Sequence, residues 1–403
     1  MKRQLLLWAL VAGLMTGLCF LGCDQPATLS SSQPSIAGVS TVTPVAGDDW
    51  SLKIVQFSVG QADAAILLAP NGDAAIVDMG KGDKAGDAIV SYLQDSNKNG
   101  LKVKPHVRYI FATHYDADHI GGAGKLRQAH LAFDKAFDQG PSRKREESDG
   151  GFSPTYKKYL DLVGDPNGNG KQDPGEDDFK RFPAKGQVDA AQPLPLGADG
   201  NVGLRVLAAC GDTHGSAHDI DLDPSDEEID ENPGSIIMLV QVGPFRFLTT
   251  GDATSSEWKK KPGTEEAVIE SGAIPGEPRV DVLKVAHHGS DTSSGRKFIL
   301  STRPEVAIIS SDNAKDALPK KTSLRLLLEA RANILVTGSA TTSGGKYHDS
   351  KNPFGGPSWT PPPGTINDGQ GTITIIISKD GKRYVVETEK NWRRAFSTAG
   401  SNN

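Results

Sequence analysis

The stretch that decides the fold runs from residue 113 to residue 122 and reads Thr113-His114-Tyr115-Asp116-Ala117-Asp118-His119-Ile120-Gly121-Gly122. Four potential metal ligands fall within six of these residues, directly after the mostly apolar run 107–112, which predicts a buried strand. Imidazole and carboxylate groups at this density suit Zn²⁺, Mn²⁺ or Fe²⁺, and the paired glycines allow a tight turn. We therefore predict a metal-binding turn at the end of a strand. The alternative is a polar loop that happens to be acidic.

Two further apolar runs end in potential ligands in the same way. Residues 247–253 read Phe-Leu-Thr-Thr-Gly-Asp-Ala and place Asp252 at the tip of a predicted strand. Residues 282–290 read Val-Leu-Lys-Val-Ala-His-His-Gly-Ser and end in the pair His287 and His288. Residues 59–63 (Val-Gly-Gln-Ala-Asp) and 77–80 (Val-Asp-Met-Gly) predict tight polar turns. For Lys284, the sequence leaves open whether the side chain faces the sheet or binds an anionic substrate.

Taken in order, these motifs resemble those of the metallo-β-lactamase superfamily. More narrowly, they resemble the hydrolase domain of ComEC-type DNA-uptake proteins and their stand-alone relatives. That group shares all five motifs, and this chain departs from them by single replacements at Ala62 and Met79. The resemblance covers about residues 51–388, interrupted by a polar insertion. It implies an α/β fold, a four-layer αββα metallo-β-lactamase sandwich, with two divalent metals (Zn²⁺ or Mn²⁺) in a cleft between sheet edges.

The resemblance also implies a role for each matching residue. The implied metal ligands are His114 and Asp116 for one ion, Asp118, His119 and His288 for the second, and Asp252 as a bridge between them. His287 would orient the site or protonate a leaving group, and Asp118 would also orient a hydroxide held by the metals. A metal pair that stabilises both the attacking and the leaving oxygen suits hydrolysis of phosphodiesters, phosphomonoesters, lactams or thioesters.

The chain also departs from the superfamily pattern at the first metal site. Asp116 replaces a histidine of the wider superfamily, as is usual in the ComEC-like branch. The only histidines in the interval before Asp252 where a further ligand ordinarily sits are His214 and His218. They lie in a polar loop, which favours solvent exposure. Leu318 stands where the branch often has histidine. We therefore expect a first site that is oxygen-rich, weakly occupied or empty, and oxygen ligands favour Mn²⁺ or Mg²⁺ over Zn²⁺.

The N-terminal residues predict export. Residues 1–22 combine Lys2 and Arg3 with an apolar run, as in a signal peptide. The sequence Leu-Gly-Cys at 21–23 resembles a lipobox, so we expect Cys23 to carry a lipid that anchors the protein to a membrane. The alternative is ordinary signal cleavage and a secreted protein. Residues 23–48, rich in Ser, Thr and Pro, predict a flexible tether.

The body of the chain, residues 49–394, is predicted to be one hydrolase domain. Short antiparallel strands at 51–58, 64–69 and 74–78 open a sheet, and strands that alternate with helices follow. The stretch of about 130–230 is polar and rich in Gly and Asp, which predicts an insertion over the site. Residues 395–403 are expected to form a disordered tail.

Residues 165–176 within the expected insertion fit the twelve-position calcium loop. Positions 1, 3, 5, 7, 9 and 12 are Asp165, Asn167, Asn169, Lys171, Asp173 and Glu176. A glycine at position 6 allows the sharp turn that such loops need. The pattern predicts a bound calcium ion, and the alternative is a flexible Asp/Asn/Gly loop.

Composition narrows the possible functions. Three cysteines are present, and only Cys210 lies in the body, so no intramolecular disulfide is expected there. The formal net charge of −6 argues against a protein that coats nucleic acid through a basic surface. The leading hypothesis is an exported, membrane-anchored, metal-dependent hydrolase of phosphoesters, with nucleic acid as the substrate that the resemblance implies. The alternatives are a hydrolase of another envelope ester or lactam, and a non-catalytic, calcium-stabilised envelope binding protein.

Overall fold

The computed structural model describes residues 49–142, 152–174, 178–216, 220, 222, 230–257, 263–312, 318–339 and 361–399. All of them belong to the unit Val42–Asn403. The predicted signal peptide, tether and lipidated Cys23 lie outside the described residues. Among the helices of the described ranges, none is long and apolar enough to span a bilayer.

Two sheets of nine strands each form within the described residues. The strands of the first sheet, in spatial order, are β18 (Arg393–Ser397), β17 (Arg383–Thr388), β16 (Ile373–Ser378), β1 (Trp50–Gln56), β2 (Ala64–Leu68), β3 (Asp73–Met79), β4 (His106–Phe111), β5 (Phe133–Asp138) and β6 (Arg181–Pro183). Those of the second are β15 (Ile366–Asn367), β14 (Asn333–Val336), β13 (Val306–Ile309), β12 (Val282–Lys284), β11 (Phe245–Thr249), β10 (Ile237–Val242), β8 (Val202–Ala209) and β7 (Leu194–Leu196), with β9 (Asp212–Thr213) paired to β8.

Each sheet is part antiparallel and part parallel. In the first, β1 and β3 flank β2 in antiparallel pairs, and the tight turn between β2 and β3 uses Gly72 at φ +93°. From β3 to β6 the strands run parallel, as do those from β11 to β15 in the second sheet. Parallel neighbours need crossover connections, and helices supply several of them. Ligand loops can therefore gather at the carboxyl ends of these strands.

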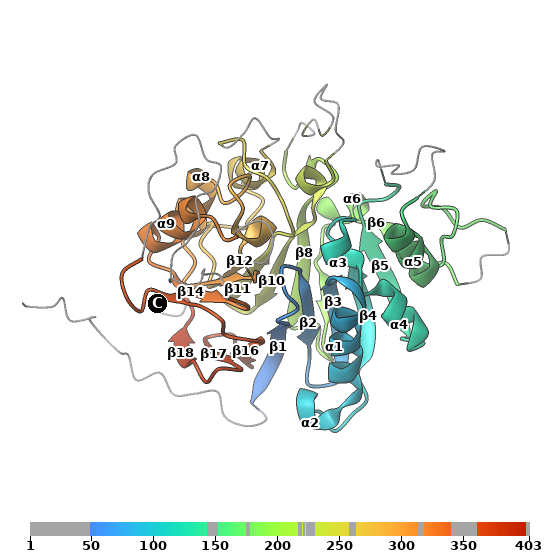
Figure 1. The fold of residues 1–403 in the computed structure, drawn as a ribbon, viewed down its shortest axis with the longest axis horizontal. Helices are drawn as coiled ribbons and strands as arrows, with labels where there is room; N and C mark the ends of the chain where they lie inside the picture. The colour runs from blue at the N-terminus through green and yellow to red at the C-terminus, as the bar shows by residue number, and fades with distance from the viewer. Residues whose placement is uncertain are drawn as a thin grey trace, which may run out of the picture. The chain divides into compact units, whose positions relative to one another are not determined.

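Helices cover the outer faces of the two sheets (Figure 1). The first sheet carries α1 (Gly82–Gln94), α2 (Ser96–Asn99), α3 (Ala117–Ile120), α4 (Ala123–Gln128) and α5 (Pro154–Val163). The second carries α7 (Thr264–Glu270), α8 (Arg296–Thr302) and α9 (Lys321–Glu329), and shorter pieces are α6 (Lys185–Val188), η1 (Asn232–Gly234) and η2 (Ala286–Gly289). One apolar core lies between the sheets, and one lies under each helical layer. The predicted four-layer αββα sandwich is therefore confirmed.

The structure corrects two predicted boundaries. The expected insertion at about 130–230 supplies β5 and β6 to the first sheet and β7 and β8 to the second. Short apolar runs such as 202–209 pair with distant strands, and the polar loops around them obscured that pattern. The expected disordered tail is ordered up to residue 399, since β18 pairs with β17 and Phe396 stacks on Tyr384 with ring centroids 5.0 Å apart.

Candidate metal centre

Three loops from both sheets converge at the carboxyl ends of parallel strands. His114 comes three residues after β4, Asp252 three residues after β11, and His287 three residues after β12. The loop after β4 continues into α3, which carries Asp118 and His119. Ligands at strand ends are held by the sheet hydrogen bonds behind them, so their positions are largely fixed by the fold.

Four imidazole rings surround one carboxylate. The Nε2 atoms of His119, His287, His288 and His114 lie 3.2, 3.7, 3.7 and 3.9 Å from the carboxylate oxygens of Asp252. Asp118 adds a carboxylate oxygen 3.5 Å from Nε2 of His288, and Asp116 one 3.6 Å from Nε2 of His114. Two ligand atoms bound tetrahedrally to one zinc ion are about 3.4 Å apart. The structure therefore brings the residues singled out in the sequence to one place, with spacings that suit divalent ions.

The other ring nitrogen of each histidine is held by the surrounding protein. Nδ1 of His288 lies 2.7 Å from the carbonyl of Ser310, which can only accept a hydrogen bond, so Nδ1 carries the proton. Nδ1 of His119 lies 2.8 Å from Asp78, and Nδ1 of His287 lies 2.7 Å from the hydroxyl of Thr292. Such outer contacts orient metal-binding imidazoles and leave Nε2 free to bind.

The atoms that face the centre of the cluster lack hydrogen-bond partners. Nε2 of His114, His119 and His288 and Oδ1 of Asp252 are buried without a partner. Because unpaired buried polar atoms are unfavourable, this set fits bound cations that would satisfy these atoms. Within the described residues, the groups His114–His119–Asp252, Asp118–His119–His288 and Asp63–Asp78–His119 have the spacing of metal ligands. The residues present therefore fit a divalent metal.

Charge within the cluster is balanced between imidazoles and carboxylates. Burial alone would raise the pKa of Asp252, but His119, His288 and His287 hold it well below its usual range. Burial opposes charge on His119 too, yet Asp252 and Asp78 raise its pKa well above the ordinary value. For His287, burial prevails and lowers the pKa. His287 is therefore suited to remain neutral.

Two pairs of residues support the cluster without having been assigned a role from the sequence, namely Asp78 with Thr113 and Lys284 with Asp63. Asp78, at φ +58°, accepts hydrogen bonds from the backbone and the hydroxyl of Thr113 in addition to its contact with His119. Lys284 points inward, where its ammonium pairs with the buried carboxylate of Asp63 at 2.7 Å. This contact decides the question left open for Lys284 in favour of an interior role. The sequence signal for both acids was the pair of polar turns at 59–63 and 77–80.

The backbone of the histidine pair is itself strained. His287 and His288 have φ values of +49° and +52°, in the left-handed region that non-glycine residues rarely adopt. Gly289 follows at φ +78°, and a Cβ there would lie 2.6 Å from that of Pro319. Strained backbone of this kind persists where a site demands a fixed side-chain direction. Here it turns both rings toward Asp252.

The sequence singled out three further positions for the first metal site, namely His214, His218 and Leu318. His214 contacts the carbonyl of Val188 at 2.8 Å and does not join the cluster. His218 lies outside the described residues. Leu318 is buried at 3% exposure. Around His114 itself, the structure places carboxylate oxygens of Asp116 and Asp252 at 3.6 and 3.9 Å from Nε2.

The predicted calcium loop uses its first ligand differently. The carboxylate of Asp165 is fully buried and pairs with the guanidinium of Arg181 at 2.6 Å. The side-chain amides of Asn167 and Asn169 both donate to Asp173, and Lys171 is bonded through its backbone N–H to Asn169. Glu176 lies outside the described residues. The guanidinium of Arg181, which pairs with the carboxylate at position 1, would repel a cation there. The structure therefore does not support calcium at this loop.

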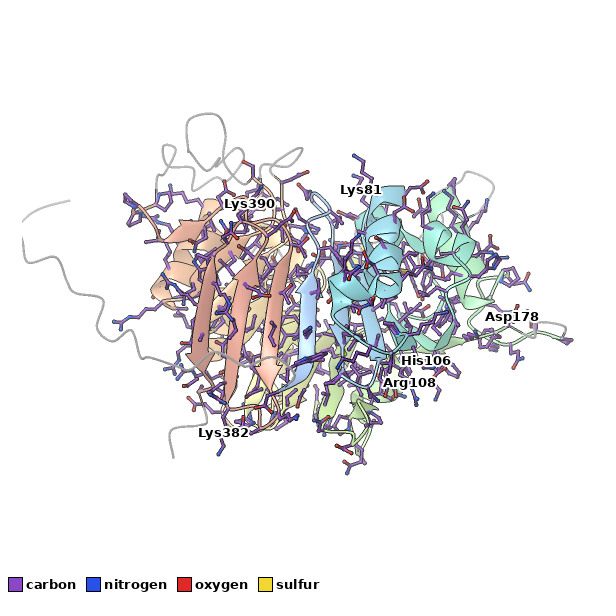
Figure 2. All side chains as sticks on the ribbon, turned by 90° about the horizontal axis from the view of Figure 1, so that it is seen from below. Lys81, His106, Arg108, Asp178, Lys382 and Lys390 are labelled. Carbon is purple, nitrogen blue, oxygen red and sulfur yellow. The ribbon has the colours of Figure 1, made fainter. Side chains whose placement is uncertain are left out.

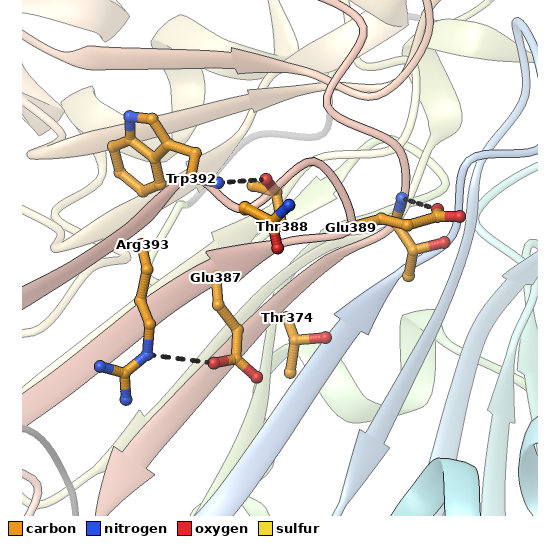
Figure 3. Close-up of a pocket in the computed structure, with 8 residues that line it drawn as sticks. Thr374, Glu387, Thr388, Glu389, Trp392 and Arg393 are labelled. Carbon is orange, nitrogen blue, oxygen red and sulfur yellow. Dashed lines mark hydrogen bonds and ion pairs between the residues drawn. The ribbon is translucent and has the colours of Figure 1, made fainter.

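A separate pocket of about 430 Å³ lies on β16, β17 and the turn before β18 (Figure 3). Its polar groups bond to one another, with Arg393 paired to Glu387 at 3.3 Å and the backbone N–H of Trp392 bonded to Thr388. None of the residues that line it belongs to the three candidate ligand groups. This pocket is therefore separate from the histidine cluster.

Comparison with known proteins shows what this geometry resembles. The metallo-beta-lactamase superfamily matches residues 62–132, which include the whole ligand loop after β4. This part of the chain is therefore similar to the metallo-β-lactamase superfamily. The match and the histidine–aspartate cluster together support divalent metal binding and a hydrolase-type role.

Known proteins similar to this chain include Competence protein ComA of Neisseria gonorrhoeae, which is 35% identical over 94 residues, 23% of this chain and 12% of that protein. ComE operon protein 3 of Bacillus subtilis (strain 168) is 32% identical over 125 residues, 31% of this chain and 15% of that protein. Recombination protein 2 of Haemophilus influenzae is 38% identical over 81 residues, 20% of this chain and 9% of that protein. The chain thus spans a small part of each. Among solved structures, the metallo-beta-lactamase of Hirschia baltica shares 13% identity with a TM-score of 0.28, covering 55% of this chain and 79% of that one.

Proposed function

We propose that this chain is a metal-dependent hydrolase of phosphoester bonds. The observation that carries the proposal is the convergence of four imidazole Nε2 atoms on Asp252, three of them buried without a partner. The ligands would be His114 and Asp116 for one ion, Asp118, His119 and His288 for the other, and Asp252 for both. Two bound divalent ions would supply Lewis acidity and make a bound water a stronger nucleophile at neutral pH.

The partly exposed side chains of the cluster define the side from which substrate would approach. The exposed fractions of Asp116, Asp118 and His287 are 37%, 25% and 25%, whereas His114, His119 and His288 are buried. Asp118, whose pKa is lowered to about 2, stays ionised and would orient an attacking water. His287, oriented by Thr292 and neutral in the free protein, would take up a proton from the attacking water and then supply it to the leaving oxygen.

The choice of phosphoester over other bonds rests on similarity to proteins named for competence and recombination. Phosphodiesters are the bonds that hydrolases break in nucleic acids, so a nucleic-acid substrate is part of the proposal. Another envelope ester or a lactam would use the same ligands, and a non-catalytic binding protein would have no need of the partly exposed Asp118 and His287. We also propose that Cys23 carries a lipid that anchors the exported protein to a membrane.

Hydrolysis of bis-p-nitrophenyl phosphate by residues 24–403, with Zn²⁺ or Mn²⁺ added, tests the proposed reaction. We expect metal-dependent turnover that falls by at least about 100-fold in His287→Gln, within the range general acids contribute. His106→Gln is the matched control, because His106 begins β4 at the end opposite the ligand loop (Figure 2) and should keep full activity.

Two results would contradict the proposal. Turnover that persists in Asp252→Ala would place the reaction away from the cluster. Hydrolysis of nitrocefin without turnover of the phosphodiester would assign a lactam substrate in its place.

A further inference from the structure

A second buried network of charged groups lies beside the ligand loop, outside the cluster that faces the metals. Its centre is Arg181 in β6, whose side chain is fully buried. The guanidinium donates from Nε to Asp138 at 2.7 Å and from Nη1 to Asp165 at 2.6 Å. Because a buried charge is tolerated only when it is paired and hydrogen-bonded, these two carboxylates compensate Arg181.

The third nitrogen of Arg181 reaches the ligand loop itself. Nη2 donates to the hydroxyl of Tyr115 at 2.8 Å and to the carbonyl of Gly140. The hydroxyl of Tyr115 also donates to the carbonyl of Gly140. In the sequence, Tyr115 stands between His114 and Asp116, the two ligands proposed for the first metal. Arg181 is therefore bonded to the one loop residue that these ligands flank.

The turn at residues 138–140 also holds the other side of His114. The side-chain amide of Gln139 donates to the carbonyl of Thr113 at 3.2 Å. Asp138 accepts the backbone N–H of Gly140 at 2.7 Å, which fixes the shape of the turn. Both neighbours of His114 are thus fastened to one turn, and Arg181 holds that turn through Asp138 and Gly140.

We propose that Arg181 and Tyr115 are positioning residues that fix the His114–Asp116 part of the metal centre before an ion binds. The inference rests on the proposed metal-binding function and deepens it. Apart from the bonds of Arg181 to Asp165 and Tyr156, the polar atoms of Arg181 and Tyr115 bond to the 138–140 turn and to each other. They therefore act through the backbone of residues 113–116. Partners bonded directly to metal ligands change metal affinity by about 10- to 100-fold when removed, so residues that act one step further out should lie at the lower end of this range.

Tyr159 in α5 provides a control that separates positioning from general stability. Its hydroxyl donates to Asp138 at 2.8 Å, so Tyr159→Phe removes one buried hydrogen bond from the same network. Tyr115→Phe removes the same chemical group from the ligand loop. Both variants keep their aromatic rings, and both should lower the unfolding midpoint to a similar extent.

The test is Zn²⁺ affinity, measured by competition with a chromophoric chelator. His114→Ala marks the binding step that involves this part of the centre. We expect Tyr115→Phe to weaken that step by about ten-fold and Tyr159→Phe to leave it unchanged. Arg181→Lys, which keeps a positive charge but loses the fork that reaches Tyr115, should weaken the same step.

Equal affinities in Tyr115→Phe and Tyr159→Phe would overturn the inference and leave the metal centre intact. A wild-type protein that binds no Zn²⁺, with His114→Ala unchanged from it, would overturn the proposed metal centre and the inference with it. The two failures are therefore distinguishable in one set of titrations.

Discussion

At the scale of single residues, a buried ion pair outside the histidine–aspartate cluster also stabilises this protein. Lys284 and Asp63 form a buried pair at 2.7 Å between two segments 221 residues apart in the chain. Lys284 holds the pKa of Asp63 below its usual value, although burial opposes this. The pair fixes the turn at 59–63 against β12, next to the histidine pair, and so supports the cluster from behind.

Glu265, in α7, is a buried acid with no cation paired to its carboxylate in the described structure, and its titration should be visible in stability. Burial raises its pKa to about 8, although the backbone N–H groups of Ser294 and Gly295 donate to it. Between the ordinary value of 4.5 and about 8, the folded state keeps a proton that the unfolded state releases. Its contribution to stability is therefore complete below pH 4.5 and decreases as the pH rises toward 8.

We expect the wild type to lose stability relative to Glu265→Gln by up to about 1.4 kcal/mol per pH unit across this range. Urea unfolding of both proteins at pH 5, 6.5 and 8 measures the difference. The variant loses one hydrogen-bond acceptor, which lowers its stability by the same amount at each pH. Parallel pH profiles for the two proteins would show that Glu265 titrates normally.

At the scale of elements, the sequence predicted best where an apolar run ends in a ligand. The strands before Asp252 and His288 could be recognised from local pattern alone. β8 could not, because its apolar run lies in a polar region and its partners β7 and β10 are identified only by the sheet order. The same holds for Asp78 and His119, which are 41 residues apart in the chain and meet because β3 and β4 are neighbours.

The last strand, β18, contributes to the core although its sequence is largely polar. β18 pairs along its length with β17, and Phe396 joins the core between the sheets. Phe396→Ala removes a ring that stacks on Tyr384, so we expect a loss of about 3–5 kcal/mol in the free energy of unfolding.

Arg393→Ala in the same strand is the control. Its side chain is half exposed and pairs only with the exposed Glu387, so a change within about 0.5 kcal/mol is expected. Chemical denaturation measures both. Equal, small effects would mean that β18 does not contribute to the core in solution.

At the scale of the whole domain, the cluster joins the two sheets. His114 and His119 follow β4 of the first sheet, whereas Asp252 and His288 follow β11 and β12 of the second. The core between the sheets holds them together, but the unpaired nitrogen and oxygen atoms at its edge face one another across that layer. A divalent ion bound there would therefore link loops from both halves of the sandwich and stabilise only the folded state.

Because an ion that binds only the folded state stabilises it by mass action, free Zn²⁺ or Mn²⁺ at 100 times its dissociation constant should add about 2.7 kcal/mol. Thermal unfolding of the chelated protein, with and without added metal, measures this increment. We expect His106→Gln to keep the full increment and Asp252→Ala to lose it, whatever the stability of that variant without metal. An equal increment in Asp252→Ala would mean that the ion binds elsewhere and that the two sheets are held together by their apolar core alone.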